Sequence, residues 1–293
     1  EITVAKGAYT AEEDVYRVTF PRTDVKVAIE GRAMHPFLGL TSWAAFTSHT
    51  QGKAQGKAQG KTQGKTQGKT QGKTQGQLIV MGDLVLFEDE VNAAMSAALD
   101  NGLEVTALHN HFFFDSPRVM FMHIGGSGTA ESLAAAVRRA LDQIQAIRAA
   151  NPQPASKFSG PPVPETNAIS APVIDGLLGV KGQVTSGMYK AVIGRKAAMH
   201  GMPIANQMGV NTWVAFAGDD ESAFVDGDFA MLEAEVQPVL KALRKAGINI
   251  VAIHNHMTHE EPQYIFLHYW GKGPAAVLAK GLRSALDTQK APR

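Results

Sequence analysis

An internal duplication constrains the fold of this 293-residue chain more than any other feature. The segment MGDLVLFEDEV at residues 81–91 returns as DGDFAMLEAEV at residues 226–236, an offset of 145 residues. A histidine-rich segment at residues 109–123 returns at residues 254–268 with the same offset. A chain of this length that repeats its pattern is expected to fold as two similar units, each with a hydrophobic core.

Two segments of unusual composition mark the predicted boundaries of these units. The tryptophan-containing segments LGLTSWAAF and MGVNTWVAF match only with an offset of 170, because the first copy carries six QGK[AT] tetrapeptides. This QGK-rich segment, residues 50–77, has no apolar face to bury and is predicted to be a disordered loop. Residues 151–172 hold six of the fourteen prolines and are predicted to be a linker. The first repeat therefore spans residues 1–150 and the second residues 173–293.

The composition excludes several functional classes. With 28 basic and 27 acidic residues, the net charge of +1 gives no indication of nucleic-acid binding. No segment approaches the roughly 20 continuous apolar residues of a transmembrane helix. The chain contains no cysteine, so disulfides, thiolate ligands and a cysteine nucleophile are excluded. Any transition metal must therefore be bound by histidine and carboxylate side chains.

Each repeat has the same order of predicted elements. Two strands lead into a helix that begins at Glu88, where acidic side chains suit the positive end of the helix dipole, and that ends before Gly102. Two adjoining strands follow around a turn at Pro117, and a second helix runs from Ala130 to about Ala149. This order favours an α+β fold with two tandem homologous domains, each a mixed or antiparallel sheet packed with two helices.

The histidine-rich segments predict a metal site in each repeat. Side chains alternate along a strand, so His109 and His111 project from the same face. A hairpin centred on Pro117 pairs residue i with residue 234 − i, which places His123 directly opposite His111. Three imidazoles that share a face can converge on one ion. The second repeat offers the same three positions, His254, His256 and His268.

Zinc is the metal expected at these sites. Three neutral imidazoles with an open fourth position are typical of catalytic zinc. Copper, iron, manganese and nickel also accept imidazole ligands and are alternative metals. The same face of the first hairpin is predicted to carry apolar side chains, namely Val105, Ala107, Val119 and Phe121. In the alternative interpretation, the histidines pack as ordinary strand residues without a metal.

Further residues are candidates for roles around the metal. Asp83 and Asp228 recur in the two repeats and are candidates to orient an imidazole through a hydrogen bond, with a strand-terminal turn as an equal alternative. Arg118 is a candidate contact for an anionic substrate, although the second repeat has glutamine there and a solvated turn residue is favoured. Trp43 and Trp213 are expected in the core rather than at a ligand site. No catalytic residue is assigned.

Six motifs distributed over both repeats carry a resemblance to a known family. They are TSWAAF, MGDLVL and LEVTALHNHFF in the first repeat, and MGVNTW, VDGDFAMLE and INIVAIHNHMT in the second. With these motifs the chain resembles a bacterial family of unknown function named after the mycobacterial lipoproteins LppY and LpqO. The resemblance implies an exported protein, periplasmic or extracellular, and implies no activity. The N-terminal cysteine of a lipoprotein is absent from this sequence.

The hairpin alone is similar to a second group of proteins. The His-x-His…His pattern of residues 109–123 resembles the zinc-binding element of acetolactate decarboxylase and of the plant and prokaryote conserved domain. Because this similarity covers only one hairpin in each repeat, it implies metal geometry and no reaction type.

The histidine pattern therefore predicts a metal-binding protein, and the family resemblance implies that it is exported. It is either a metal-dependent enzyme, in which the ion polarises a carbonyl or activates water, or a non-catalytic module that binds metal or a cell-envelope ligand. A structural protein with packed histidines is the third hypothesis. The expected partner is a small molecule or a cell-envelope ligand, and no nucleic acid is expected. Substrate, metal and oligomeric state are left open.

Overall fold

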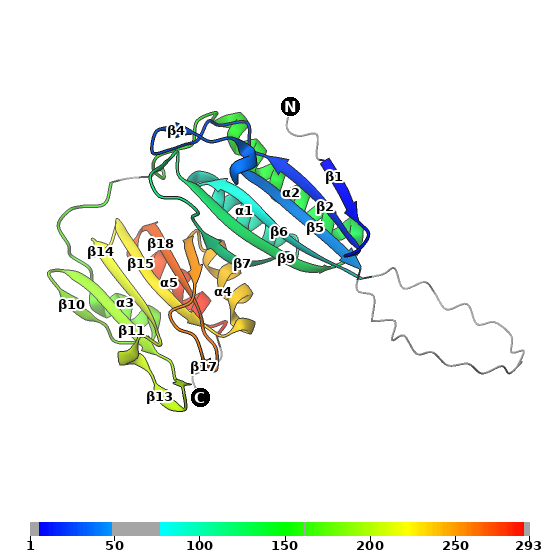
Figure 1. The fold of residues 1–293 in the computed structure, drawn as a ribbon. Helices are drawn as coiled ribbons and strands as arrows, with labels where there is room; N and C mark the ends of the chain where they lie inside the picture. The colour runs from blue at the N-terminus through cyan, green and yellow to red at the C-terminus, as the bar shows by residue number, and fades with distance from the viewer. Residues whose placement is uncertain (1–5, 49–76, 161, 290–293) are drawn as a thin grey trace, which may run out of the picture.

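A computed structural model of the chain describes residues 6–48, 77–160 and 162–289 (Figure 1). The QGK-rich loop predicted at residues 50–77 lies outside the described residues, apart from Gln77. The strands of the first repeat are β1 (Lys6–Thr10), β2 (Val15–Pro21), β3 (Ala28–Ile29), β4 (Arg32–Ala33), β5 (Thr41–Ser48), β6 (Leu78–Phe87), β7 (Glu104–His109), β8 (Asp115–Ser116) and β9 (Val119–Gly128). Its helices are α1 (Glu88–Asp100) and α2 (Ala130–Ala150), which confirm the two helices predicted from the sequence.

The second repeat has the same order of elements, with a further helix at its start. Its strands are β10 (Gln183–Thr185), β11 (Met188–Gly194), β12 (Ala197–Met199), β13 (Met202–Ile204), β14 (Asn211–Gly218), β15 (Ala223–Met231), β16 (Asn249–His254), β17 (Glu260–Glu261) and β18 (Ile265–Gly273). Its helices are α3 (Ala171–Leu178), α4 (Glu233–Lys245) and α5 (Ala275–Leu286). The proline-rich composition of residues 151–172 did not predict α3. Pro172 is nevertheless tolerated in its first turn, where no backbone N–H is needed.

One large sheet joins the two repeats. Twelve strands follow the order β1-β2-β5-β6-β9-β7-β16-β18-β15-β14-β11-β10, and their pairings are antiparallel. At the centre of this sheet β7 meets β16, where Leu108 pairs with Ile253. The sequence predicts a sheet for each repeat, whereas the structure joins both into one. The pairing covers two strand edges that separate sheets would leave exposed.

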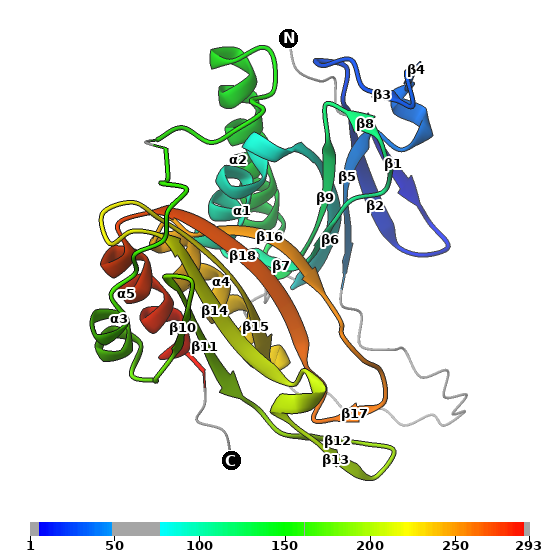
Figure 2. The same ribbon diagram turned by 90° about the vertical axis from the view of Figure 1, so that its left-hand side faces the viewer.

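The helices pack on one face of this sheet (Figure 2). A single hydrophobic core contains residues of α1, α2, α3, α4 and α5 together with apolar side chains from strands of both repeats. Burial of one such leucine or valine contributes about 1.5–3 kcal/mol to folding. Among the described residues, no helix combines the length and the apolar character needed to cross a bilayer.

The opposite face of the sheet carries two smaller apolar clusters, one in each repeat. Side chains alternate along β6, so Leu84 and Leu86 face the helices while Val85 and Phe87 lie in the cluster of the first repeat. The three-stranded sheet β4-β3-β8 lies near this cluster, and the sheet β13-β12-β17 contributes residues to the cluster of the second repeat. The predicted histidine sites lie on this face.

A β-bulge in β7 turns Val105, which was predicted to lie beside the histidines, to the other face of the sheet. The ladder between β7 and β9 shifts register between Val105 and Ala107, which leaves Thr106 as an extra residue. Val105, predicted to lie beside the histidines, therefore faces the helices and is fully buried there. The same shift in β16, between Ile250 and Ala252, turns Ile250 toward the helices.

Side-chain amides from each repeat bind the bulged strand of the other. The Asn92 amide of α1 accepts a hydrogen bond from the Ile250 N–H at 2.8 Å and donates one to the Ile250 carbonyl at 3.3 Å. The Gln237 amide of α4 makes the same pair of bonds with Val105, at 3.0 and 2.9 Å. These two pairs are related by the offset of 145 residues. They satisfy backbone groups at the points where the bulges interrupt the ladder.

Candidate metal centre

The third histidine of each repeat lies on the strand that pairs with the strand of the first histidine. The register of this pairing differs from the predicted one. In the first repeat Ala107, rather than His111, lies opposite His123. The predicted hairpin centred on Pro117 is wrong, because residues 110–118 form a longer connection whose strand β8 pairs with β3. The true register differs from the predicted one by an even number of residues. His109 and His123 therefore still share a face of the sheet.

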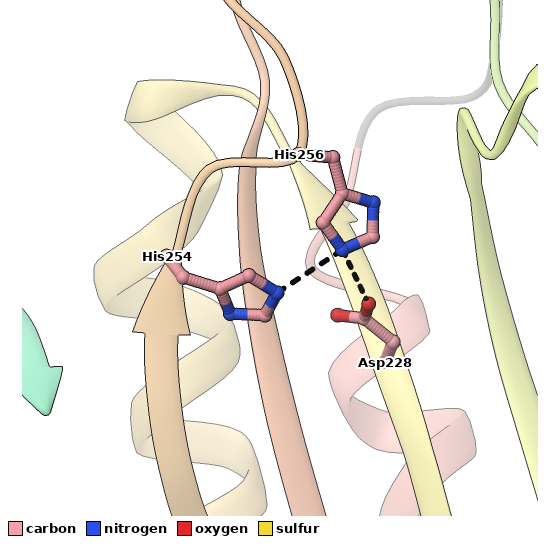
Figure 3. Close-up of side chains that lie close together, drawn as sticks. All are labelled: Asp228, His254 and His256. Carbon is pink, nitrogen blue, oxygen red and sulfur yellow. Dashed lines mark hydrogen bonds and ion pairs between the residues drawn. The ribbon is translucent and has the colours of Figure 1, made fainter.

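In the second repeat, three side chains bring potential ligand atoms together (Figure 3). His254 lies at the end of β16, His256 lies in the loop that follows, and Asp228 lies on β15. The Nε2 atoms of the two histidines are 3.0 Å apart, and His256 Nε2 lies 3.1 Å from Asp228 Oδ2. The ligand atoms of all three residues lie within 4.8 Å of one another. Two zinc bonds of about 2.0–2.1 Å that meet at a tetrahedral angle hold their ligand atoms about 3.3 Å apart, so this spacing suits one shared ion.

His268 lies beside this group. It is the residue of β18 that pairs with Asp228, and its ring stacks on His254 with the centroids 4.8 Å apart. His268 Nδ1 lies 3.3 Å from the carbonyl oxygen of Gly227. A proton on Nδ1 can be donated to that carbonyl, which leaves the Nε2 lone pair available to a metal. All three histidines predicted for the second repeat therefore gather around one carboxylate.

The first repeat gathers the corresponding side chains in a different arrangement. His109 Nε2 and His123 Nε2 are 3.0 Å apart, and the ring of His111 lies 5.1 Å from that of His109. Asp83 pairs with His123 between β6 and β9. The Oδ1 atom of Asp83 is buried and has no hydrogen-bond partner among the described residues. A buried carboxylate oxygen without a partner is costly, and a cation held by the neighbouring imidazoles would compensate it.

A buried phenylalanine supports one imidazole in each group. The ring of His111 stacks on Phe121 with centroids 3.4 Å apart and an interplanar angle of 4°. The ring of His256 stacks on Phe266 at 3.6 Å and 10°. Both histidines follow the last residue of their strand, so the strand does not orient them. The phenylalanine rings provide that support because both are buried in the sheet.

A glycine precedes each aspartate and explains the recurring Gly-Asp pair. A Cβ atom at Gly227 would lie 2.1 Å from the Tyr269 hydroxyl oxygen, and one at Gly82 would lie 2.7 Å from the Trp43 carbonyl oxygen. A side chain therefore does not fit on the side of the strand opposite the aspartate. The backbone of the neighbouring strand, and in the second repeat also Tyr269, occupies the space beside the glycine. The aspartate that follows points to the other side of the strand, where the histidines lie.

Burial keeps two of the histidines in the neutral form that a metal requires. It is the main cause that lowers the pKa of His111 and of His254, and positive charge on the neighbouring histidines lowers both pKa values further. A neutral imidazole is the form that binds a metal. Burial raises the pKa of Asp83, and the neighbouring positive charges oppose that effect. A cation at this position would stabilise the ionised carboxylate.

The structure assigns the two aspartates a place that the sequence did not predict. Asp228 is 1% exposed, its Oδ1 accepts a hydrogen bond from the Leu267 N–H at 3.0 Å, and its Oδ2 is one of the converging ligand atoms. The sequence offered this residue as a group that orients an imidazole. Asp228 of β15 pairs with His268 of β18, and this pairing places the carboxylate among the histidines. It could be inferred from the sequence only if the pairing of the two strands were known.

The remaining candidates lie outside the groups of converging ligand atoms. The Arg118 guanidinium lies 3.9 Å from Glu88, is 62% exposed, and lines a cavity of about 730 Å³ between the two repeats. Trp43 and Trp213, predicted in the core, are partly exposed instead. They lie opposite the two aspartates in the sheet, on the same face as the histidines.

Comparison with known families agrees with the duplication. A family model described as Domain of Unknown Function (DUF1259) matches residues 1–62, 63–143 and 173–288. No curated protein and no solved structure matches the chain. The matched segments cover most of both repeats and leave out the proline-rich segment between them. The chain therefore belongs to the family defined by the Domain of Unknown Function (DUF1259).

Proposed function

We propose that the protein is an exported metal-binding protein with one divalent transition-metal centre in each repeat. One arrangement carries this proposal: the ligand atoms of Asp228, His254 and His256 converge within 4.8 Å. The corresponding residues of the first repeat gather at the equivalent place in the sheet. Imidazole and carboxylate ligands suit Zn²⁺, which we expect as the bound metal, and copper, iron, manganese and nickel accept the same ligands.

Each proposed centre has four candidate side chains, and any three of them would hold a zinc ion with its fourth position open. In the second repeat they are His254, His256, His268 and Asp228. In the first repeat they are His109, His111, His123 and Asp83. Ion binding would satisfy the buried Oδ1 of Asp83, which explains why a carboxylate is placed in this buried position.

Metal-dependent catalysis is the more specific form of this proposal. The His256 side chain is 30% exposed while Asp228 is 1% exposed, so one side of an ion at this position would face solvent. A zinc ion that keeps such an open position lowers the pKa of bound water to about 7 and polarises carbonyl groups. A module that binds metal or a cell-envelope ligand without catalysis is the alternative.

Two resemblances support this proposal. The motifs shared with the LppY and LpqO lipoproteins run through both repeats and support an exported, periplasmic or extracellular protein. The similarity of the hairpin at residues 109–123 to the zinc element of acetolactate decarboxylase supports the metal. Neither resemblance indicates a substrate.

Zinc content tests this proposal directly. Protein purified without a His tag is equilibrated with Zn²⁺, freed of excess metal and analysed by inductively coupled plasma mass spectrometry. We expect about two equivalents per chain, one for each centre, and about one equivalent for the double variant His254→Ala/His256→Ala, which leaves the second centre only two of its four side chains. The matched control His259→Asn changes a histidine of the same loop whose positive φ of 67° asparagine tolerates, and it should keep about two. Less than about a tenth of an equivalent in the unchanged protein would show that the histidines only pack.

A further inference from the structure

A cationic side chain stacked on a tryptophan lies beside each proposed metal centre. The guanidinium carbon of Arg17 is 4.1 Å from the centroid of the Trp43 ring. The Nζ atom of Lys190 is 4.4 Å from the centroid of the Trp213 ring. In the sheet, Trp43 pairs with Asp83, and Trp213 occupies the equivalent position in the second repeat. Each tryptophan therefore separates a cation from a carboxylate of the proposed centre.

The two cations occupy equivalent positions in the sheet. Arg17 of β2 pairs with Ala45, and Lys190 of β11 pairs with Ala215. Each of these alanines lies two residues beyond the tryptophan of its strand. The number of residues between cation and tryptophan nevertheless differs between the repeats. The fold, rather than a repeated local motif, therefore brings a cation and an indole ring together twice at the same place.

The position of Arg17 suits a ligand that also touches the metal. Strand β2 lies two strands from β6, which corresponds to about 10 Å across the sheet. Arg17 is exposed and Trp43 is partly exposed, so both are accessible from the face that carries the histidines. Burial raises the pKa of Asp83, and the charge of Arg17 is among those that oppose this rise, which agrees with the proximity of the two side chains. A small molecule can therefore reach both the proposed ion and the guanidinium.

The two repeats differ in the charges around their cations. In the first repeat the residue of β6 that pairs with Ala45 is Met81. In the second repeat the residue of β15 that pairs with Ala215 is Asp226, which is exposed. Asp226 offers Lys190 a counter-charge on the same face, whereas Met81 offers Arg17 none. An anion is therefore attracted more strongly to the first repeat.

We propose that the first repeat binds a small planar ligand with a carboxylate at one end and a metal-binding group at the other. The carboxylate contacts Arg17, whose planar guanidinium matches the two oxygens. The planar part of the ligand lies along Trp43. The metal-binding group reaches the ion held by the first centre. This inference rests on the proposed metal function and adds the chemical class of the ligand.

Two probes that differ in a single carboxylate test this inference. Benzohydroxamate binds zinc through its hydroxamate, and 4-carboxybenzohydroxamate adds a carboxylate at the far end of the ring. Binding is measured by isothermal titration calorimetry with the zinc-loaded full chain carrying His254→Ala and His256→Ala together, which leaves the second centre only two of its four side chains, so that only the first centre is occupied. We expect the carboxylated probe to bind about tenfold more tightly, as one charge-assisted contact provides.

Arg17→Gln should abolish this preference and leave zinc content and the affinity for benzohydroxamate unchanged. Arg118→Gln, a substitution at another exposed arginine of the same repeat, is the matched control and should keep the preference. If zinc binds and the two probes bind equally, or if Arg17→Gln keeps the preference, the inference is wrong and the metal centre stands. If no zinc binds, the proposed function itself is wrong.

Discussion

At the scale of single residues, each proposed centre depends on a carboxylate that the alternation of a strand buries beside imidazoles. Asp228 connects two roles, because Oδ1 accepts the Leu267 N–H and Oδ2 lies 3.1 Å from His256 Nε2. Removal of the side chain would disturb both the strand and the ligand group. Removal of its charge alone separates the two roles.

Asp228→Asn should weaken zinc binding at the second centre at least ten- to a hundredfold, because the neutral amide keeps the size and the acceptor oxygen but loses the charge. Competition with a chelator of known zinc affinity measures the change. Asp226→Asn, two residues along β15 and exposed, is the matched control and should have little effect. Equal zinc affinity in the two variants would exclude Asp228 as a ligand.

Phe121→Leu should weaken the first centre and leave the second unchanged. The substitution removes the stacked support of His111 and should destabilise the fold by about 1 kcal/mol, the value of an aromatic pair beyond its buried area. Phe266→Leu should affect the second centre alone. Zinc titration of both variants checks this reciprocity, and an equal loss at both centres in either variant would contradict it.

Residue types and spacing selected the histidines of both proposed centres but not the carboxylates proposed to join them. His109 and His123 could be placed on one face because strand alternation is a local property, whereas His111 lies beyond the end of β7 and is held by its stacking on Phe121. The carboxylate ligands could not be recognised as such, because the position of Asp83 beside His123 depends on the pairing of β6 with β9. The partly exposed tryptophans were misplaced for the same reason.

At the scale of elements, a buried glutamate ties the start of a helix to the strands that carry each centre. Glu90 of α1 is fully buried, pairs with Arg22 and Arg148 at 2.8 and 2.7 Å, and accepts the Phe87 N–H at 2.9 Å. Its counterpart Glu235 in α4 pairs with Arg195 at 3.0 Å. Because α1 directly follows β6, this network holds the end of the strand on which Asp83 lies.

Glu90→Gln should destabilise the protein by about 1–3 kcal/mol, because it removes a buried charge shared by two arginines, while Arg22 keeps its pair with Asp24 and Arg148 keeps its pair with Asp89. Glu88→Gln changes an acidic residue of the same helical turn that is 52% exposed, and it should cost less than about 0.5 kcal/mol. Urea unfolding followed by circular dichroism measures both. Similar free energies of unfolding for the two variants would show that the buried network contributes little.

Elements with local signals were predicted well, and those that depend on distant contacts were not. The acidic first turn and Gly102, with its φ of 86°, mark the limits of α1 in the sequence. The register of β7 on β9 was wrong by four residues, because the loop between them contains β8 and pairs with β3. The bulge at Thr106 carries no sequence signal of its own.

At the scale of the whole molecule, the duplication produces one continuous sheet with a reciprocal contact at its centre. Asn92 and Gln237 each bind the backbone of the bulged strand in the other repeat. Each repeat therefore completes the backbone hydrogen bonding of its copy. A single cooperative unfolding transition of both repeats is the expected consequence.

Asn92→Ala should lower the free energy of unfolding by about 1–3 kcal/mol, because it leaves the buried Ile250 N–H and carbonyl without this partner. Asn101→Ala is the matched control, since that exposed amide bonds only within its own helix end at Ala97. Urea denaturation measures the change. Separate transitions for the two repeats in the unchanged protein would contradict the reciprocal contact as a source of cooperativity.

Anomalous diffraction at the zinc absorption edge, from crystals of untagged protein soaked in Zn²⁺, tests the metal centres most directly. The account predicts one peak about 2.0–2.2 Å from the ligand atoms of His254, His256 and Asp228, and a second at the same distance from His109 and His123. Strong peaks only at other surface positions, with none at either histidine group, would contradict it.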